Sequence, residues 1–184
     1  MNEEISIAWI KLSVCPISSK NSKTILNELN GSFTKNSINA LMGSSGSGKS
    51  TLLKCLNGSR KYRFSDETKI LVRNDQKIRQ IFIHQNQEER LLKDLTVEQA
   101  FTYSSKLKNS GESGVDHKKI VSDLLPDLLI SDIKSNRIDK CSGGQIKRIC
   151  FGLELTSVKK PNLLFIDEPT TGLDSNAAEV VSHF

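Results

Sequence analysis

One loop, residues 43–51, constrains the fold of this chain more than any other feature. It reads GSSGSGKST and matches G-x-x-x-x-G-K-[ST], a glycine-rich loop whose backbone N–H groups surround the phosphates of a nucleotide. Because several amides must point at one anion, such a loop needs glycine where a side chain would clash or where φ is positive. The pattern predicts that Lys49 reaches the β- and γ-phosphates and that the Ser50 hydroxyl binds Mg²⁺.

The flanking segments favour this interpretation over a flexible Gly/Ser linker. Residues 37–42 predict a short strand that enters the loop, and residues 50–56 predict a helix that leaves it. Gly58 should end this helix, since glycine readily takes the left-handed conformation at a helix C-terminus. The candidate phosphate-binding residues are Gly43, Ser44, Ser45, Gly46, Ser47, Gly48, Lys49, Ser50 and Thr51.

The composition is that of an ordinary globular protein. With 184 residues, 36% hydrophobic and 26% charged, the chain can form one sizeable core and is too polar for a membrane-helix bundle. It has no secretory signal, and its four cysteines lack C-x-x-C spacing, so we expect free thiols in a soluble, cytoplasmic piece. The net charge is +5, but the basic residues are scattered, and we expect no nucleic-acid partner.

The apolar patterns predict an α/β protein. Residues 5–14 and 24–33 read as two strands ahead of the loop, and residues 70–72 suggest an edge strand. Residues 80–85 and the continuous apolar segment 163–166 predict two further strands, the latter buried on both faces of a parallel sheet. Strands alternating with helices are typical of this class.

Three helices are predicted between residues 80 and 163. Thr96 and Gln99 form a capping box at the start of the first helix. Asp116 opens the second, which Pro126 should end or kink, and the third follows Ser142. The side chains expected to face the core are Val97, Ala100, Phe101, Ser104, Leu107, Ile120, Val121, Leu124, Leu125, Ile146, Ile149, Cys150, Leu153 and Val158.

Two carboxylates follow the last apolar strand. Phosphoryl transfer depends on positioning and charge neutralisation, so a phosphate-binding loop needs a carboxylate for the metal and a group that orients water. Asp167 and Glu168 supply these at a strand's C-terminal end, where open α/β sheets bind ligands. Asp167 would hold Mg²⁺, and Glu168 would polarise the attacking water. Without the loop, an ordinary exit from the strand would explain the pair equally well.

A serine and two glycines precede the third helix, at residues 142–144. They make an anion-binding helix N-terminus that needs no lysine, or an ordinary helix cap. If this second cradle faces outward, it can complete the site of another copy, and the active form would be a dimer. Gln85, at the end of its strand, would then contact Mg²⁺ or water. The candidate residues of the second cradle are Ser142, Gly143, Gly144 and Gln145.

The order of these motifs resembles the nucleotide-binding domain of an ABC ATPase. Residues 142–155, SGGQIKRICFGLEL, are similar to the SGGERKRVSIGLEL of the G-type (White-like) half-transporters, and residues 95–107 to their LTVREALxFSAxLR. The resemblance covers nearly the whole chain. It implies that residues 1–184 form an ABC transporter ATP-binding domain, incomplete at the C-terminus. The implied fold is a P-loop NTPase (RecA-like) core with an N-terminal antiparallel β-subdomain and an inserted helical subdomain at about residues 91–145.

The resemblance also implies roles, cofactors and partners. The ligands would be ATP and Mg²⁺, and two such domains, alike or different, would enclose two ATPs head to tail. Hydrolysis would drive a transmembrane domain, expected after this chain in sequence, to move lipids or other hydrophobic molecules at the cytoplasmic face of a membrane. Implied catalytic residues are Lys49, Gln85 and Glu168; implied metal ligands are Ser50, Gln85 and Asp167; and Asp174 would be the D-loop aspartate.

The chain departs from the family pattern in several places. The switch histidine should lie further beyond Glu168 than the chain extends, and His183 comes too early. Cys141 stands where leucine is usual, and no aromatic residue lies at 10–12, the position of adenine stacking, although Trp9 is adjacent. We therefore expect little hydrolysis from these 184 residues alone. The alternatives are a truncated, non-catalytic ATP-binding remnant and a soluble ABC ATPase.

Overall fold

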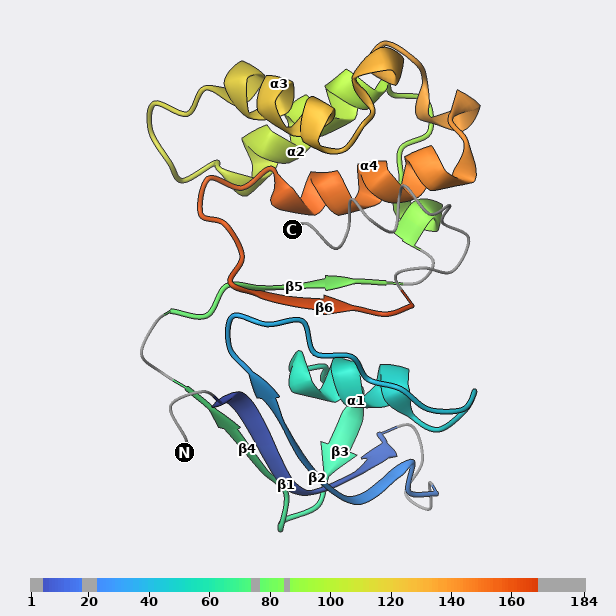
Figure 1. Ribbon diagram of the computed structural model, residues 1–184, viewed down its shortest axis with the longest axis vertical. Coiled ribbons are helices and arrows are strands. Elements are labelled where there is room, and N and C mark those ends of the chain that lie inside the picture. Colours follow the sequence, from blue (N-terminus) through green and yellow to red (C-terminus); the bar gives the residue numbers. More distant parts are fainter. Residues whose placement is uncertain (1–4, 18–22, 74–76, 85–86, 169–184) are drawn as a thin grey trace. The chain divides into compact units, whose positions relative to one another are not determined.

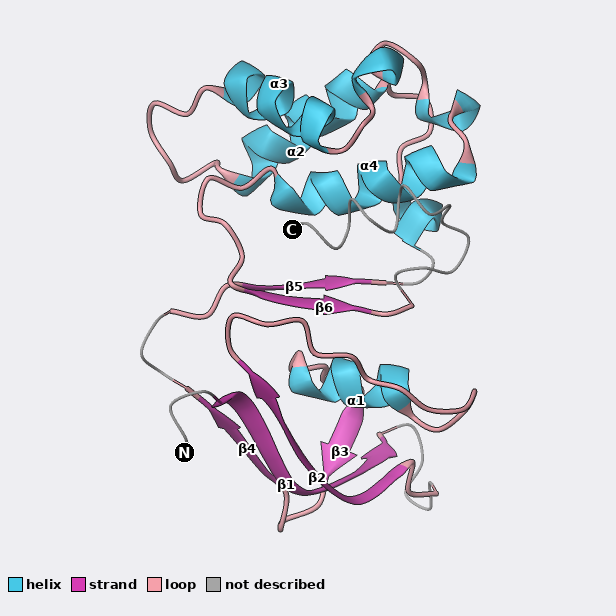
Figure 2. Cartoon of the chain, in the orientation of Figure 1, coloured by secondary structure: helices cyan, strands magenta, loops and turns pink. Residues whose placement is uncertain are grey.

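The chain divides into two compact units, residues 1–78 and 79–184. The computed structural model describes residues 5–17, 23–73, 77–84 and 87–168 (Figure 1). Most strands of the described residues belong to the first unit, and most helices belong to the second (Figure 2). Each unit therefore has its own type of core.

The first unit is built on an antiparallel sheet. Its strands are β1 (Ile5–Pro16), β2 (Leu26–Thr34), β3 (Tyr62–Phe64) and β4 (Lys69–Val72), and β1 pairs with each of the other three. The strands predicted at 5–14, 24–33 and 70–72, and the antiparallel subdomain, are confirmed. The short strand β3 was not predicted, because the charged sequence around it hides the alternation that marks a strand.

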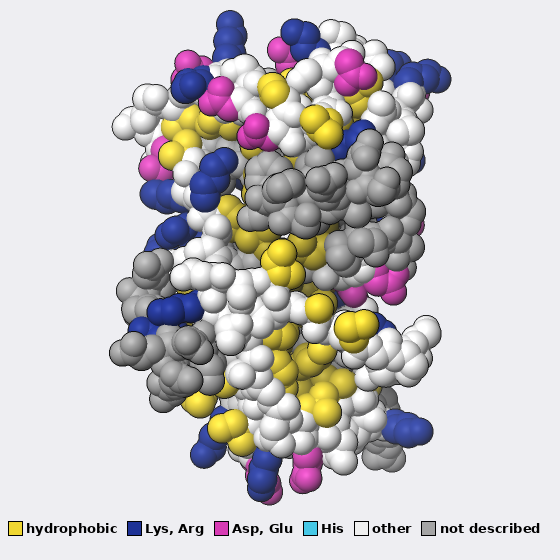
Figure 3. Space-filling model, in the orientation of Figure 1, with side chains coloured by type: hydrophobic (Ala, Val, Ile, Leu, Met, Phe, Trp, Pro, Cys, Tyr) yellow, Lys and Arg dark blue, Asp and Glu magenta, His cyan; other side chains and the backbone are white. Residues whose placement is uncertain are grey.

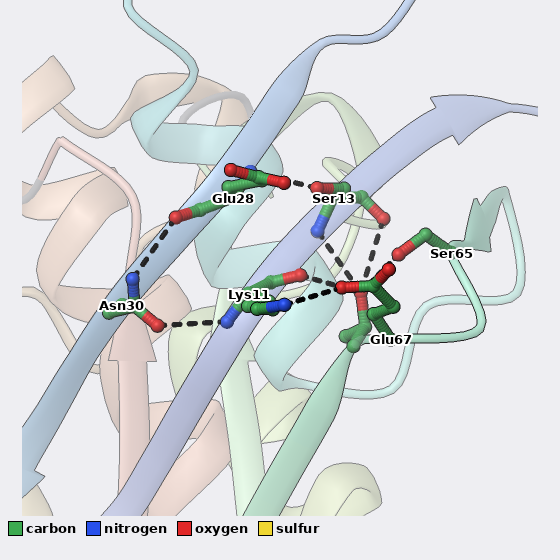
Figure 4. A network of polar contacts seen from close by, with 7 residues as sticks. Lys11, Ser13, Glu28, Asn30, Ser65 and Glu67 are labelled. Atoms are coloured by element: carbon green, nitrogen blue, oxygen red, sulfur yellow. Dashed lines mark hydrogen bonds and ion pairs between the residues drawn. The ribbon is translucent and has the colours of Figure 1, made fainter.

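The middle of β1 is irregular and carries a polar network (Figure 4). Lys11 has a φ of 48°, and the register with β2 shifts between Trp9 and Leu12. The Lys11 N–H donates to Asn30 Oδ1 at 2.9 Å, and its Nζ lies 2.6 Å from Glu67 Oε2. This hydrogen bond is the main reason that the pKa of Lys11 is raised and that of Glu67 is lowered. The pair is solvent-exposed and contributes little to stability.

Helix α1 (Lys49–Leu56) leaves the glycine-rich loop, as predicted. Its residues Leu52, Cys55 and Leu56 are buried. At its end Gly58 has a φ of 77°, its N–H donates to Cys55 O, and the next amide, of Ser59, donates to Lys54 O. These two bonds make a Schellman motif, which confirms Gly58 as the helix stop.

The strand predicted at 37–42 is wrong. This segment has no strand, and Ile38 and Met42 are 82% and 88% exposed. Local hydrogen bonds satisfy the backbone instead: Asn39 Nδ2 donates to Thr34 O at 3.0 Å, and Thr34 N–H donates to Asn39 Oδ1 at 3.1 Å. Such side-chain bonds compete with strand pairing. A parallel strand also needs parallel neighbours, whereas the described sheet of the first unit is antiparallel.

The second unit has a helical core. It contains α2 (Val97–Lys108), α3 (His117–Asp127), α4 (Gly143–Leu155) and short 3₁₀ turns at Gln87–Arg90, Ser131–Ile133 and Ile138–Lys140. The capping box of α2 and the N-cap of α3 form as predicted, and Pro126 lies in the last turn of α3. The buried side chains of this core are Val97, Ala100, Phe101, Val121, Leu124, Leu125, Leu128, Ile130, Ile133, Ile138, Ile149, Phe151 and Leu155.

Gly152 allows α4 to approach this core closely. A Cβ at this position would lie 2.2 Å from Leu128 Cδ1 and 2.7 Å from Phe101 Cζ. Two predicted core positions are wrong: Leu107 is 77% exposed, and Val158 lies beyond the end of α4 and is 48% exposed. On α2, Ser105 is buried in place of Leu107, and its hydroxyl forms a hydrogen bond with the ring of His117.

Two parallel strands complete the second unit. Strands β5 (Gln80–Ile83) and β6 (Leu163–Ile166) form where the sequence predicts strands, and the structure shows that they pair with each other. Leu164 and Ile166 pack against the helical core, while Phe165 is the buried residue of β6. Among the described residues, no helix combines the length and the apolar character that crossing a bilayer requires. On the face drawn in Figure 3, the Lys and Arg side chains lie apart from one another.

Candidate functional site

The glycine-rich loop forms a cradle that requires glycine. Gly46 and Gly48 have φ of 77° and 94°, in the left-handed region where side chains are strained. A Cβ on Gly48 would lie 2.5 Å from Leu26 Cδ2, and one on Gly43 would lie 2.8 Å from Ser47 Oγ. The sequence pattern does not reveal the role of Leu26, because its partner is distant in the chain. The loop is thus shaped to let backbone amides approach a ligand.

No side chain caps the helix that follows this loop. Gly48 is the N-cap of α1, and it makes no side-chain hydrogen bond to the first amides. The first turn of α1 also has no acidic residue. Because the initial N–H groups of a helix lack intrahelical acceptors and carry a partial positive charge, this end suits an anion.

Lys49 lies folded over the loop. Its Nζ donates to the carbonyl oxygens of Gly43 and Ser44, both at 2.8 Å, and the Ser47 N–H also donates to Ser44 O. The ammonium group is therefore held at the mouth of the loop by two neutral acceptors. Phosphate oxygens carry charge and make stronger bonds with it than carbonyls do. The arrangement fits a polyphosphate, whose oxygens would replace the two carbonyl oxygens as acceptors of the Lys49 ammonium group.

Trp9 does not present its ring as a stacking surface. The residue is 6% exposed, and its ring covers Gly31, where a Cβ would lie 2.3 Å from Trp9 Cζ2. It also meets Phe33 edge-on, with centroids 5.0 Å apart. The aromatic residue nearest to positions 10–12 is therefore part of the core of the first unit.

Asp167 and Glu168 lie at the C-terminal end of β6. Asp167 is 7% exposed, and its N–H donates to Ile83 O at 3.0 Å, which extends the parallel pairing by one residue. Glu168 is exposed and has a φ of 55°. A non-glycine residue in this region is strained, and such strain concentrates at functional sites. The left-handed backbone of Glu168 thus directly follows the buried Asp167 at the end of β6.

The second cradle begins helix α4. Ser142 is the N-cap, and it forms a capping box with Gln145: the Gln145 N–H donates to Ser142 Oγ at 3.3 Å, and the Ser142 N–H donates to Gln145 Oε1 at 2.8 Å. Ser142 and Gly143 are exposed, and the space around Gly143 is open. The structure thus contains the ordinary helix cap, one of the two alternatives left open by the sequence, and this cap uses the side chain of Gln145.

The predicted site residues fall into two groups. The loop at 43–51 belongs to the first unit, while Asp167, Glu168 and the 142–145 cradle belong to the second. Gln85 follows β5, but Gln85, Asp174 and His183 lie outside the described residues. Within the second unit, the end of β6 carries the carboxylates and the start of α4 carries the cradle.

The buried thiols lie on the helices that begin at the two cradles. Burial raises the pKa of Cys55, on α1, to about 11, and that of Cys150, on α4, to about 12. Cys141, just before the α4 cradle, also has a raised pKa because of partial burial and the nearby charge of Asp139. These cysteines are therefore protonated at neutral pH and serve as small apolar groups.

Comparison with known proteins finds one family. The ABC transporter family model matches residues 26–171. ABC transporter G family member 13 of Arabidopsis thaliana is 35% identical over 190 residues, covering 94% of this chain and 26% of that protein. ABC transporter G family member 1 of Petunia hybrida is 35% identical over 189 residues, covering 98% of this chain and 30% of that protein. This chain therefore spans less than a third of the length of these relatives.

A solved structure has the same fold. It is cbiO1 from Clostridium perfringens, described as part of the ABC transporter complex cbiONQ. The TM-score is 0.71 at 22% identity, and the match covers 98% of this chain and 72% of that chain. The fold class predicted from the sequence, α/β of the P-loop NTPase type, is confirmed by this likeness.

Proposed function

Since this chain belongs to the ABC transporter family, as a nucleotide-binding domain of its G group, we propose that it binds ATP in the 43–51 loop and hydrolyses it to drive transport. Residues 1–184 form this domain, with the helical subdomain at about 91–145. The observation that carries the proposal is the loop itself: left-handed glycines, an uncapped helix start and a lysine held over its mouth.

The residues divide the chemistry among them. Loop amides and Lys49 would bind the phosphates, and the Ser50 hydroxyl, Asp167 and Gln85 would be the ligands of Mg²⁺, directly or through water. When bound, Mg²⁺ would supply the charge neutralisation that phosphoryl transfer requires. Glu168 accepts the proton of the attacking water. Glycine at 43 and 48 keeps the cradle free of side-chain atoms that would fill it.

Association of two such domains completes the site. We place Ser142, Gly143 and Gly144 of one copy against the triphosphate held by the other, so that ATP draws the copies together and hydrolysis releases them. A transmembrane domain converts this cycle into movement of lipids or other hydrophobic molecules, with the ATP-binding domain at the cytoplasmic face of the membrane. The open space at Gly143 supports such a contact.

Replacing the base tests this function. In the protein together with its membrane domain, Glu168→Gln should keep ATP binding but lower turnover at least 100-fold, because general-base catalysis contributes roughly 10²–10⁴ to the rate. The ATP-bound dimer should then persist, as measured by sedimentation and by phosphate release. Glu98→Gln, at an exposed carboxylate on α2, is the control.

Rapid turnover by Glu168→Gln would remove Glu168 from its role. Loss of ATP binding in this variant would mean that the carboxylate is structural. The 184-residue chain alone should hydrolyse little ATP, and brisk steady-state hydrolysis by it would contradict this expectation.

A further inference from the structure

Two helices of the second unit begin with the same capping box. At α2, Thr96 N–H donates to Gln99 Oε1 at 2.9 Å, and Gln99 N–H donates to Thr96 Oγ1 at 3.2 Å. At α4, the corresponding bonds between Ser142 and Gln145 are 2.8 and 3.3 Å. The chain therefore offers two nearly identical caps, whose surroundings can be compared directly.

The next two amides of these helices differ. At α2, Val97 N–H donates to Asn136 O and Glu98 N–H donates to Lys134 O, both at 3.0 Å, so the helix start is sealed by a neighbouring loop. At α4, the N–H groups of Gly143 and Gly144 have no acceptor among the described residues. Neither glycine has a side chain that could screen its amide.

The cap at α4 also determines what Ser142 can do. A serine hydroxyl has one donor hydrogen and two acceptor lone pairs. The Gln145 N–H occupies one lone pair, and the Gln145 side chain occupies the Ser142 N–H. Among the described residues, the hydroxyl hydrogen has no acceptor. Within the described part of the chain, three donors from consecutive residues therefore have no protein acceptor and can bind an outside anion: the Ser142 hydroxyl and the two glycine amides.

We infer that Gln145 is a positioning residue: it holds Ser142 so that these three donors face the triphosphate of a second copy. The inference rests on the proposed function, and it revises the expectation that Gln145 itself binds nucleotide. Gln145 makes this cap without a charge, whereas a glutamate there would place a negative charge beside the donors. The neutral side chain preserves their attraction for an anion.

The test compares the two caps in one protein. Glu168→Gln is the parent, so that bound ATP is not consumed, and Gln145→Ala, Gln145→Glu and Gln99→Ala are added to it singly. Sedimentation velocity in Mg·ATP gives the dimer dissociation constant. A fluorescent ATP analogue, titrated into dilute protein, gives the affinity of the monomer's own loop. Thermal melting gives the stability lost with each cap.

Gln145→Ala should weaken the Mg·ATP-dependent dimer roughly tenfold while leaving the monomer's affinity unchanged, because the lost cap acts only on the second copy's ligand. Gln99→Ala should lower the melting temperature as much but leave the dimer constant unchanged. Gln145→Glu, which can rebuild the cap, should restore the dimer to within about threefold of the parent.

Different failures overturn different claims. If the parent stays monomeric in Mg·ATP, the proposed association of two copies fails, and the role of Gln145 fails with it. If the parent dimerises and Gln145→Ala has the same constant, only the positioning role is wrong. Equal weakening by Gln99→Ala would show that cap loss acts through general stability.

Discussion

Helices α1 and α4 both begin at a candidate phosphate cradle, but the two helix starts are built in opposite ways. At α1 the N-cap is Gly48, with a φ of 94° and no side-chain cap. At α4 the N-cap is Ser142, which has an extended backbone and shares a capping box with Gln145. The start of α1 has no side-chain cap, whereas the capping box of α4 satisfies the amides of Ser142 and Gln145 and leaves two glycine amides without an acceptor among the described residues.

This difference suggests two roles: the α1 cradle binds the ligand, and the α4 cradle contacts a ligand that is already bound. The α1 cradle has a cation, Lys49, and a backbone that only glycine adopts readily, so it should hold a triphosphate by itself. The α4 cradle has no basic residue in its first turn and should add to a ligand that is already held elsewhere. Substitutions at α1 should therefore change ATP affinity, while those at α4 should change association.

The largest effect on ATP affinity should come from Lys49→Ala. Loss of charged hydrogen bonds to phosphate, worth roughly 1.5–3 kcal/mol, should weaken ATP binding about 10- to 100-fold. Calorimetric titration with Mg·ATP measures this, and Lys54→Ala, on the last turn of the same helix, is the matched control. Unchanged affinity in Lys49→Ala would mean that the α1 cradle does not grip phosphate, which would break the comparison.

Gly48→Ala should destabilise the first unit. The new Cβ must take a left-handed φ and would overlap Leu26 Cδ2, for a combined cost of roughly 2–4 kcal/mol. Gly58→Ala is the control, since Gly58 has a similar φ of 77° but open space around it, and should cost only about 1 kcal/mol. Urea unfolding gives both values. Equal losses would show that the close approach to Leu26 adds nothing.

The smallest effect concerns the two buried thiols, one on each helix. Their folded pKa values, about 11 for Cys55 and about 12 for Cys150, lie above the ordinary value of 9.0. The unfolded chain therefore loses these protons first, and stability should fall as pH rises from about 9 toward 12, by roughly 1 kcal/mol for each thiol at pH 10. Cys55→Ala and Cys150→Ala should each flatten the pH dependence of urea midpoints; an unchanged slope would contradict thiol burial.

Local signals in the sequence predict much of the fold. The capping box of α2, the serine cap of α4 and the glycine stop at residue 58 depend on residues close together in sequence, and strands β5 and β6 depend on simple apolar runs. The glycine-rich loop is recognised by its spacing alone, because few sequences combine tight turns with a lysine at that position.

Other features depend on contacts that spacing does not encode. The segment 37–42 looks like a strand, but Asn39 satisfies the local backbone by its side chain. The irregular backbone of β1 at Lys11 is hydrogen-bonded to the side chain of Asn30, which is distant in sequence. In each case a polar side chain chooses a partner that the apolar pattern cannot predict.

The most direct test of the central claim is a crystal structure with Mg·AMP-PNP. The account predicts that the triphosphate occupies residues 43–51 and that Lys49 Nζ leaves the carbonyl oxygens of Gly43 and Ser44 for the β- and γ-phosphates. An empty loop at saturating ligand, with Lys49 still bonded to both carbonyls, would contradict it.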